Sequence, residues 1–227
     1  MQNFYGEEIE NMFITFEGVE GSGKSTQAKL LYTWLLKKDI DCILTKEPGG
    51  TSIGEKIREI LLSSKNKGMK PRTELFLYGA DRVQHVEDVI KPAIKDKKIV
   101  ICDRFADSTV AYQMYARGLW DWIVGSVQHL ASGNLKPDIT FLLDLPVEVG
   151  LKRAWDRINS EDGKKDESRI EEETLQFHEK VRNGYLAIAK KEPERFYVLD
   201  AQLPPGKIHT DIITKLVLSL ICGVRRI

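Results

Sequence analysis

The stretch Gly18-Val19-Glu20-Gly21-Ser22-Gly23-Lys24-Ser25 follows an apolar run that begins at Met12. Its spacing, G-x4-G-K-[ST], is that of a P-loop, in which glycines let backbone N–H groups curl around phosphate oxygens. Lys24 can reach the β- and γ-phosphates, and the Ser25 hydroxyl can ligate Mg²⁺. A helix that starts near Lys24 aims its positive end at the same anion. We therefore expect the loop, through Thr26, to bind a nucleoside triphosphate.

The composition indicates an ordinary globular chain. Its 227 residues are 42% hydrophobic and 30% charged, and Lys+Arg equals Asp+Glu at 34 each. Without an excess of basic residues, nucleic acid is not an expected partner. Residues 1–11 are acidic and polar, unlike a secretory signal, and the apolar run Leu216–Val224 is too short to span a bilayer. We expect a cytoplasmic protein with no membrane segment and with residues 1–11 as an N-terminal extension.

Short apolar, β-branched runs recur along the chain and alternate with segments of helical spacing. The runs lie at residues 12–17, 41–45, 98–102, 138–143 and 195–199. This alternation predicts an α/β fold: a doubly wound five-stranded parallel sheet flanked by helices, of the P-loop NTPase or nucleotide kinase type. Residues 12–227 form a single domain in this interpretation. Ligands of such sheets gather at the carboxyl ends of the strands.

One segment departs from the alternation. Residues 156–173 are rich in charge and poor in core-forming residues. A solvated loop is one interpretation, since charge runs usually face water. A lid whose basic residues close over bound phosphates is the other. Composition alone does not decide between them.

A carboxylate and a guanidinium follow the third predicted strand. Asp103 ends that strand beside the P-loop, where it can hold Mg²⁺ from the side opposite Ser25. Arg104 can neutralise charge on a phosphoryl group in transit. An Asp-Arg pair that merely caps the next helix is the alternative. A P-loop protein that hydrolyses its nucleotide often has a glutamate here instead, and no N-K-x-D guanine-reading motif is present. A GTPase or partition-type ATPase is therefore disfavoured.

A second anion site is expected across from the P-loop. The second predicted strand leads into Glu47-Pro48-Gly49-Gly50-Thr51, a turn rich in exposed backbone N–H groups. Arg58 and Arg82 follow on predicted helices. Each arginine alone would be an ordinary surface residue, but together with the turn they indicate a second phosphate site.

These motifs resemble thymidylate kinases of bacterial type, in register from Met12 to about Thr210. The resemblance rests on Gly18–Ser25, Glu47–Thr51, Asp103–Gly118 and Arg169–Glu171. The third of these, DRFADSTVAYQMYARG, is similar to the family signature D-R-Y-x-x-S-x-x-A-Y-Q and is the most specific. The resemblance implies transfer of the γ-phosphoryl group of MgATP to dTMP, giving dTDP for dTTP biosynthesis, by a homodimer. A kinase for another nucleoside monophosphate is excluded only by this resemblance.

The resemblance also implies roles for individual residues. Lys24, Asp103, Arg104 and Arg169 match catalytic positions, and Ser25 and Asp103 match the Mg²⁺ ligands. ATP contacts are implied for the loop from Gly18 to Thr26, for Arg153 and for Ala201. The implied dTMP contacts are Glu20, Glu47, Arg58, Tyr78, Arg82, Arg104, Thr109, Tyr112 and Gln113.

Two features depart from the family pattern as we read it. Tyr78 stands where a phenylalanine usually stacks on thymine, and the lid is longer than the usual D-R-x-E stretch. Gly21 stands where eukaryotic-type enzymes carry a P-loop arginine, so the lid is expected to supply the catalytic cation. The lid candidates left open are Arg157, Lys164, Lys165 and Arg169.

Overall fold

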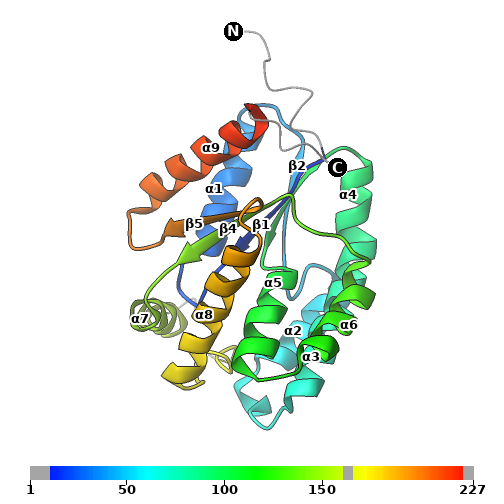
Figure 1. Ribbon diagram of the computed structural model, residues 1–227, viewed down its shortest axis with the longest axis vertical. Coiled ribbons are helices and arrows are strands. Elements are labelled where there is room, and N and C mark those ends of the chain that lie inside the picture. The colour runs from blue at the N-terminus through cyan, green and yellow to red at the C-terminus, as the bar shows by residue number, and fades with distance from the viewer. Residues whose placement is uncertain (1–10, 161–165, 222–227) are drawn as a thin grey trace.

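A five-stranded parallel sheet forms the centre of the protein (Figure 1). The computed structural model describes residues 11–160 and 166–221. The strand order is β2-β3-β1-β4-β5. The strands are β1 (Phe13–Glu17), β2 (Cys42–Lys46), β3 (Ile99–Asp103), β4 (Ile139–Asp144) and β5 (Phe196–Asp200). The predicted sheet is confirmed, and each strand lies within one residue of its predicted bounds.

Helices cover both faces of this sheet. They are α1 (Lys24–Leu36), α2 (Ser52–Leu62), α3 (Pro71–His85), α4 (Lys91–Lys95), α5 (Ala106–Thr109), α6 (Asp121–Ser132), α7 (Val147–Ile158), α8 (Leu175–Lys191) and α9 (Pro205–Ile221). A 3₁₀ turn, η1 (Ser64–Asn66), follows α2. The π-helical segments η2 (Val86–Ile90) and η3 (Val110–Ala116) continue α3 and α5, respectively. α3, η2 and α4 therefore follow one another without a break from Pro71 to Lys95.

The central strand β1 is completely buried and links two apolar clusters. Ile14 and Phe16 join the larger cluster with residues of α1, α8 and α9, while Phe13 joins the smaller one with Val100 and Cys102. The rings of Phe16 and Phe141 lie 5.4 Å apart. Successive residues of a strand point to opposite faces, which explains the division. The strand that leads into the P-loop is thus held by packing on both sides.

The parallel register brings the strand ends together. Phe16 pairs with Asp103 across β1 and β3, and Lys46 pairs with Asp103 across β2 and β3. The ends of β1, β2 and β3 therefore lie side by side at the carboxyl edge. This is where P-loop folds bind their ligands.

The predicted lid, residues 156–173, begins inside the last turn of α7. Residues 161–165 lie outside the described part of the chain. The remainder is not helical and returns to the end of α2, where Ser64 N donates to Asp166 O at 2.9 Å and Arg169 N donates to Leu62 O at 3.1 Å. This part of the lid is therefore hydrogen-bonded to the body of the protein.

Within the described ranges, we find no helix that combines the length and apolar character needed to cross a bilayer.

Candidate active site

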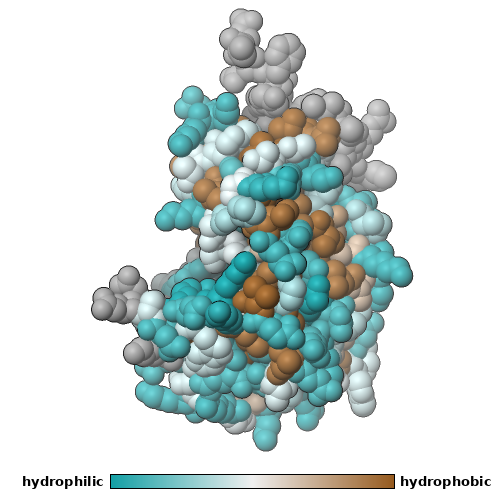
Figure 2. All heavy atoms as spheres, turned by 90° about the vertical axis from the view of Figure 1, so that its left-hand side faces the viewer, coloured by the Kyte–Doolittle hydropathy of each residue, from teal (hydrophilic) through white to brown (hydrophobic). Residues whose placement is uncertain are grey.

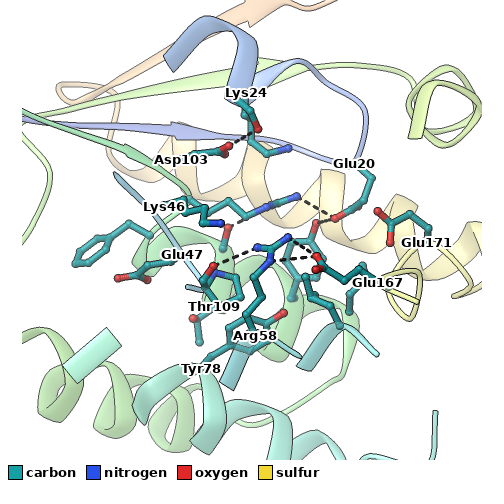
Figure 3. Close-up of a pocket in the computed structure, with 18 of the residues that line it drawn as sticks. Glu20, Lys24, Lys46, Glu47, Arg58, Tyr78, Asp103, Thr109, Glu167 and Glu171 are labelled. Carbon is teal, nitrogen blue, oxygen red and sulfur yellow. Dashed lines mark hydrogen bonds and ion pairs between the residues drawn. The ribbon is translucent and has the colours of Figure 1, made fainter. Parts of the chain in front are cut away.

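A cavity of about 570 Å³ opens at the carboxyl edge of the sheet (Figure 3). Lys24 and Asp103 lie on its P-loop side, and Tyr78 of α3 lies on the opposite wall. Most of the predicted site residues line it: Glu20, Gly21, Lys24, Ser25, Thr26, Glu47, Arg58, Tyr78, Arg82, Asp103, Arg104, Thr109, Tyr112 and Gln113. The predicted residues that are not among its lining residues are Gly18, Val19, Ser22, Gly23, Arg153, Arg169 and Ala201.

The P-loop has a backbone that only glycine adopts readily. Gly21 has φ 69° and Gly23 has φ 92°. A Cβ added to Gly21 would lie 2.0 Å from the carbonyl oxygen of Gly150 in α7, whereas a Cβ on Gly23 would meet no atom within 4 Å. A side chain at position 21 is therefore disfavoured by the backbone and would require α7 to shift.

Lys24, the first residue of α1, folds back into the loop. Its Nζ donates to Val19 O at 2.8 Å and lies 3.3 Å from Ser22 Oγ. Burial and the charge of Arg104 lower the pKa of Lys24 to about 8. A buried ammonium is stabilised by a nearby anion. The loop therefore fits a phosphate group.

Two hard oxygen donors meet beside Lys24. The Ser25 hydroxyl, at the start of α1, donates to the Asp103 carboxylate at the end of β3. In the ranges 11–160 and 166–221, no group of three or more His, Cys, Asp or Glu residues could hold a metal ion. Mg²⁺ commonly needs only one or two protein carboxylates, with phosphates and water completing its shell. The Ser25–Asp103 pair fits such an ion when a nucleotide supplies the phosphates.

Arg104 lines the cavity and has an uncommon backbone conformation. Its φ of 72° lies in the left-handed region, which disfavours residues other than glycine. The guanidinium donates to Glu20 Oε1 at 2.9 Å and to Gly18 O at 3.1 Å, and it lies over the ring of Tyr112. Strained backbone of this kind persists only where surrounding contacts fix it. The site is therefore built to hold this guanidinium in one place.

Glu20 is the carboxylate partner of this cation. It also accepts from the Tyr112 hydroxyl, and His178 Nδ1 lies 3.3 Å from its Oε2. Burial would raise the pKa of Glu20, but the neighbouring His178, Arg104 and Lys24 hold it well below the usual range. Glu20 is therefore ionised at neutral pH. Its proximity to His178, on the buried face of α8, is not visible in the local sequence.

Arg82 braces the wall of the cavity. Its guanidinium donates to Glu47 at 2.8 Å, to Thr109 at 3.0 Å and to the carbonyl of Phe105 at 3.1 Å. The side chain is only 2% exposed. Arg82 lies at the cavity, as predicted. Its guanidinium, however, is bound by protein groups and so connects α3 with α5 and with the turn after β2.

Arg58, in contrast, holds a carboxylate from the predicted lid. Glu167 Oε2 accepts from Arg58 Nε at 3.2 Å and from Nη2 at 2.9 Å, and Pro48 O accepts from Nη1 at 3.1 Å (Figure 3). The Glu167 side chain is 17% exposed. A carboxylate therefore lies on the arginine that the sequence assigned to an acceptor phosphate.

Arg169 lies away from the cavity, in contrast to its predicted place in the site. This residue, expected to be catalytic, is 3% exposed and pairs with Glu74 of α3 at 2.7 Å. It also donates to Leu61 O, while Arg117 donates to both carboxylate oxygens of Glu74. A buried guanidinium needs a partner, and the partner lies 95 positions earlier in the chain. Arg169 thus ties the lid segment to α3 instead of lining the cavity.

Arg157 is the lid candidate that does line the cavity. It lies in the last turn of α7, its side chain is 64% exposed, and its Nη2 lies 3.7 Å from Glu171 Oε1. Burial, and then the charge of Glu20, raise the pKa of Glu171. Lys164 and Lys165 lie outside the described residues.

Arg153 and Ala201 lie together beyond the cavity. Arg153 Nη1, on α7, donates to Ala201 O at 3.1 Å. Ala201 follows β5 and its N–H donates to Asp144 O at 2.8 Å. The two residues predicted to border adenine therefore share one place at the carboxyl edge.

Sequence reasoning missed several polar residues of the site. The missed residues are Glu17, Ser108, Glu167, Glu171, His178 and Tyr185. Glu17 is the clearest, because burial and the charge of Asp107 raise its pKa to about 7. An acidic residue at the end of an otherwise apolar strand was the available signal.

Comparisons with known proteins agree with this geometry. The sequence model of the family described as thymidylate kinase matches residues 16–212. A thymidylate kinase of Desulfosudis oleivorans is 51% identical over 205 residues, which cover 90% of this chain and 96% of the relative. One of Geotalea daltonii is 55% identical over 188 residues, covering 83% and 88%. The crystal structure of a thymidylate kinase from Ehrlichia chaffeensis has a TM-score of 0.73 at 35% identity and covers 91% of this chain and 98% of that one.

Proposed function

The chain belongs to the thymidylate kinase family, which phosphorylates dTMP to dTDP in nucleotide biosynthesis, and we propose that the cavity around Arg104 is where this reaction occurs. One observation carries the proposal: Lys24 of α1, Arg58 of α2 and Arg104 of the loop after β3 line the same cavity. Two anionic substrates must meet in such a site, and separate cations can hold each of them.

The P-loop is the donor side. Residues Gly18–Thr26 hold the phosphates of ATP through backbone N–H groups and Lys24, and Arg153 with Ala201 borders the adenine. Ser25 and Asp103 hold Mg²⁺, which offsets phosphate charge when bound. Support comes from the buried ammonium of Lys24 and from the Ser25–Asp103 hydrogen bond.

The acceptor side lies between α2, α3 and η3. Arg58 binds the 5′-phosphate of dTMP, and the Glu167 carboxylate leaves it when the phosphate arrives. Tyr78 supplies the aromatic face for thymine. The other acceptor contacts are Glu20, Glu47, Arg82, Thr109, Tyr112 and Gln113. All of these residues line the cavity.

The transfer itself is positional and electrostatic. An acceptor phosphate oxygen is already ionised at neutral pH, so no general base is needed. Arg104 stabilises the phosphoryl group in transit. The attraction between a fixed cation and the developing negative charge is stronger in a site from which water is excluded. Arg157 is the lid cation that assists it. Support for Arg157 over Arg169 comes from its place in the cavity lining.

The face formed by α2, α3 and α6 is the proposed homodimer interface. These helices lie beside one another at the lower right of Figure 1. They and the residue before α6 carry most of the large exposed apolar side chains: Ile53, Ile60, Phe76, Val83, Trp120, Trp122 and Leu130. Figure 2 shows another side of the molecule, with α7, β5 and α9, where apolar atoms form a broken band among hydrophilic ones. Concentrated apolar patches mark protein interfaces.

The cytoplasm is the proposed location. Cys42 and Cys102 are both free thiols, and burial strongly raises the pKa of Cys102. Unpaired cysteines persist in a reducing compartment.

Replacement of Arg104 tests the transfer site. We expect Arg104→Ala to lower kcat by about 10²–10³, the scale found for analogous electrostatic stabilisers. A coupled assay with dTMP, dUMP, dCMP, AMP and GMP measures kcat and acceptor preference together. Near-normal turnover of a folded Arg104→Ala protein would contradict the assigned role, and weak activity on dTMP would contradict the assigned acceptor.

Arg58 and Glu167 should affect dTMP binding in opposite directions. Arg58→Ala should raise the KM for dTMP by about 10- to 100-fold, since a charge-assisted hydrogen bond is lost. Glu167→Gln should lower it by about two- to fivefold, because a competing ion pair of modest strength is removed. Steady-state kinetics at saturating ATP measure both effects. Glu172→Gln, which alters a contact with Lys67 outside the cavity, is the matched control and should leave the KM unchanged.

Replacement of Arg157 should affect catalysis, whereas replacement of Arg169 should affect stability. Arg157→Ala should lower kcat by about 10²-fold with little loss of stability, because the side chain is exposed and faces the cavity. Arg169→Ala should lower the free energy of unfolding by about 3 kcal/mol, since it breaks a buried ion pair whose carboxylate keeps a second partner. Urea unfolding and single-turnover kinetics separate the two effects. A stable Arg169→Ala protein with the larger kinetic loss would reverse the assignment.

The dimer interface can be tested with one charge. Phe76→Asp places a carboxylate on α3 at a side chain that is 62% exposed, and Leu218→Asp does so on α9 at 47%. We expect the first variant to sediment as a monomer at about 10 µM and the second to remain dimeric, because desolvating an unpaired charge opposes association. Wild-type protein that sediments as a monomer would contradict the proposal.

A further inference from the structure

Glu17 is a buried carboxylate that does not line the cavity and has no part in the proposed chemistry. It ends β1, immediately before the P-loop, and its exposure is 0%. Three groups donate to it: Phe105 N to Oε1 at 2.7 Å, Ser108 Oγ to Oε2 at 2.7 Å and Tyr185 Oη to Oε2 at 3.0 Å. A charge in the interior is costly unless it is fully hydrogen-bonded, so this carboxylate needs an explanation.

The same two hydroxyl groups contact Arg104. Arg104 Nη1 donates to Tyr185 Oη at 3.0 Å and lies 3.4 Å from Ser108 Oγ. The hydroxyls also lie 2.7 Å from one another. Each hydroxyl has one proton to donate and lone pairs that accept. Glu17 accepts these protons in its ionised form, which predominates above its pKa of about 7. When the protons point to Glu17, directly or through the other hydroxyl, the lone pairs of the hydroxyls face the guanidinium.

Glu17 also fixes the backbone next to Arg104. Glu17 accepts a hydrogen bond from the N–H of Phe105, the residue that follows Arg104 with its φ of 72°. The N–H of Arg104 itself donates to Phe16 O at 3.0 Å. A left-handed residue other than glycine is held only by such contacts. Glu17 therefore constrains both the main chain next to Arg104 and, through the two hydroxyls, the position of the guanidinium.

We propose that Glu17 is a positioning residue for phosphoryl transfer, which acts through Phe105 N–H and the hydroxyls of Ser108 and Tyr185 to aim Arg104 at the transferred group. This inference rests on the proposed role of Arg104. Glu17 touches neither substrate in this arrangement. It sets the direction of the hydrogen bonds that the cation makes.

The near-isosteric variant Glu17→Gln tests that direction. Phe105 N–H keeps the amide oxygen on its side, so the amide NH₂ faces the two hydroxyls and donates to them. Their protons then turn toward Arg104 and repel it. We expect kcat to fall by about 10- to 100-fold, less than for loss of Arg104 itself, with the KM values for ATP and dTMP within about threefold of wild type.

A double-mutant cycle separates positioning from a general structural role. In the Arg104→Ala background, Glu17→Gln should change kcat by less than about twofold, because its effect passes through the missing guanidinium. Effects that multiply in the double variant, or a folded Glu17→Gln enzyme with wild-type kcat, would overturn the inference. Arg104→Ala with unchanged kcat would instead contradict the proposed function.

Further variants keep the inference testable if Glu17→Gln does not fold. Tyr185→Phe and Ser108→Ala each remove one hydroxyl and should give partial losses of kcat that also vanish without Arg104. Wild-type kcat in both would overturn the relay. Thr15→Val is the matched control, since it removes a buried hydrogen bond to Thr140 from the same strand, away from Arg104. Thermal melting should show a loss of stability for Thr15→Val, with kcat unchanged.

Discussion

Positive charge held out of water is the constraint on which this site depends. Two polyanions must be bound, so cations gather at the carboxyl edge of the sheet, and each needs a partner while the substrates are away. Arg104 has Glu20, Arg58 has Glu167 and Arg82 has Glu47. Lys24 uses the carbonyl of Val19. The carboxylates serve as internal anions, which avoids the cost of an unpaired buried charge.

These pairs differ in how they respond to a substrate. Arg82 is enclosed and has several protein acceptors, so it stays in the wall. Arg58 is held by a single carboxylate, which a doubly charged phosphate can outcompete. Arg104 lies between these cases, because Glu20 and the relay from Glu17 fix it while part of the side chain still faces the cavity. Arg82 and Arg104 each have several protein acceptors, so exposure is what distinguishes the three side chains: 2% for Arg82, 19% for Arg104 and 23% for Arg58.

The sheet, and the meeting of the P-loop with Asp103 at its carboxyl edge, could be predicted because their signals are local. Apolar runs, the glycine spacing and Asp103-Arg104 each lie within a few residues, and parallel register brings them together. Arg169 was misplaced because its partner, Glu74, is remote in sequence and no local pattern reports it. Glu17 was missed for a similar reason: its three donors come from the main chain at Phe105, from α5 and from α8. The identity of a buried ion-pair partner is a tertiary property.

The close approach of Gly21 to Gly150 has a consequence for how such enzymes can change over time. A side chain at position 21 requires α7 to move, and α7 carries Arg157 at its far end. A side chain gained at position 21 therefore needs a compensating shift in α7. The sequence of the loop and the position of this helix are expected to vary together among related enzymes.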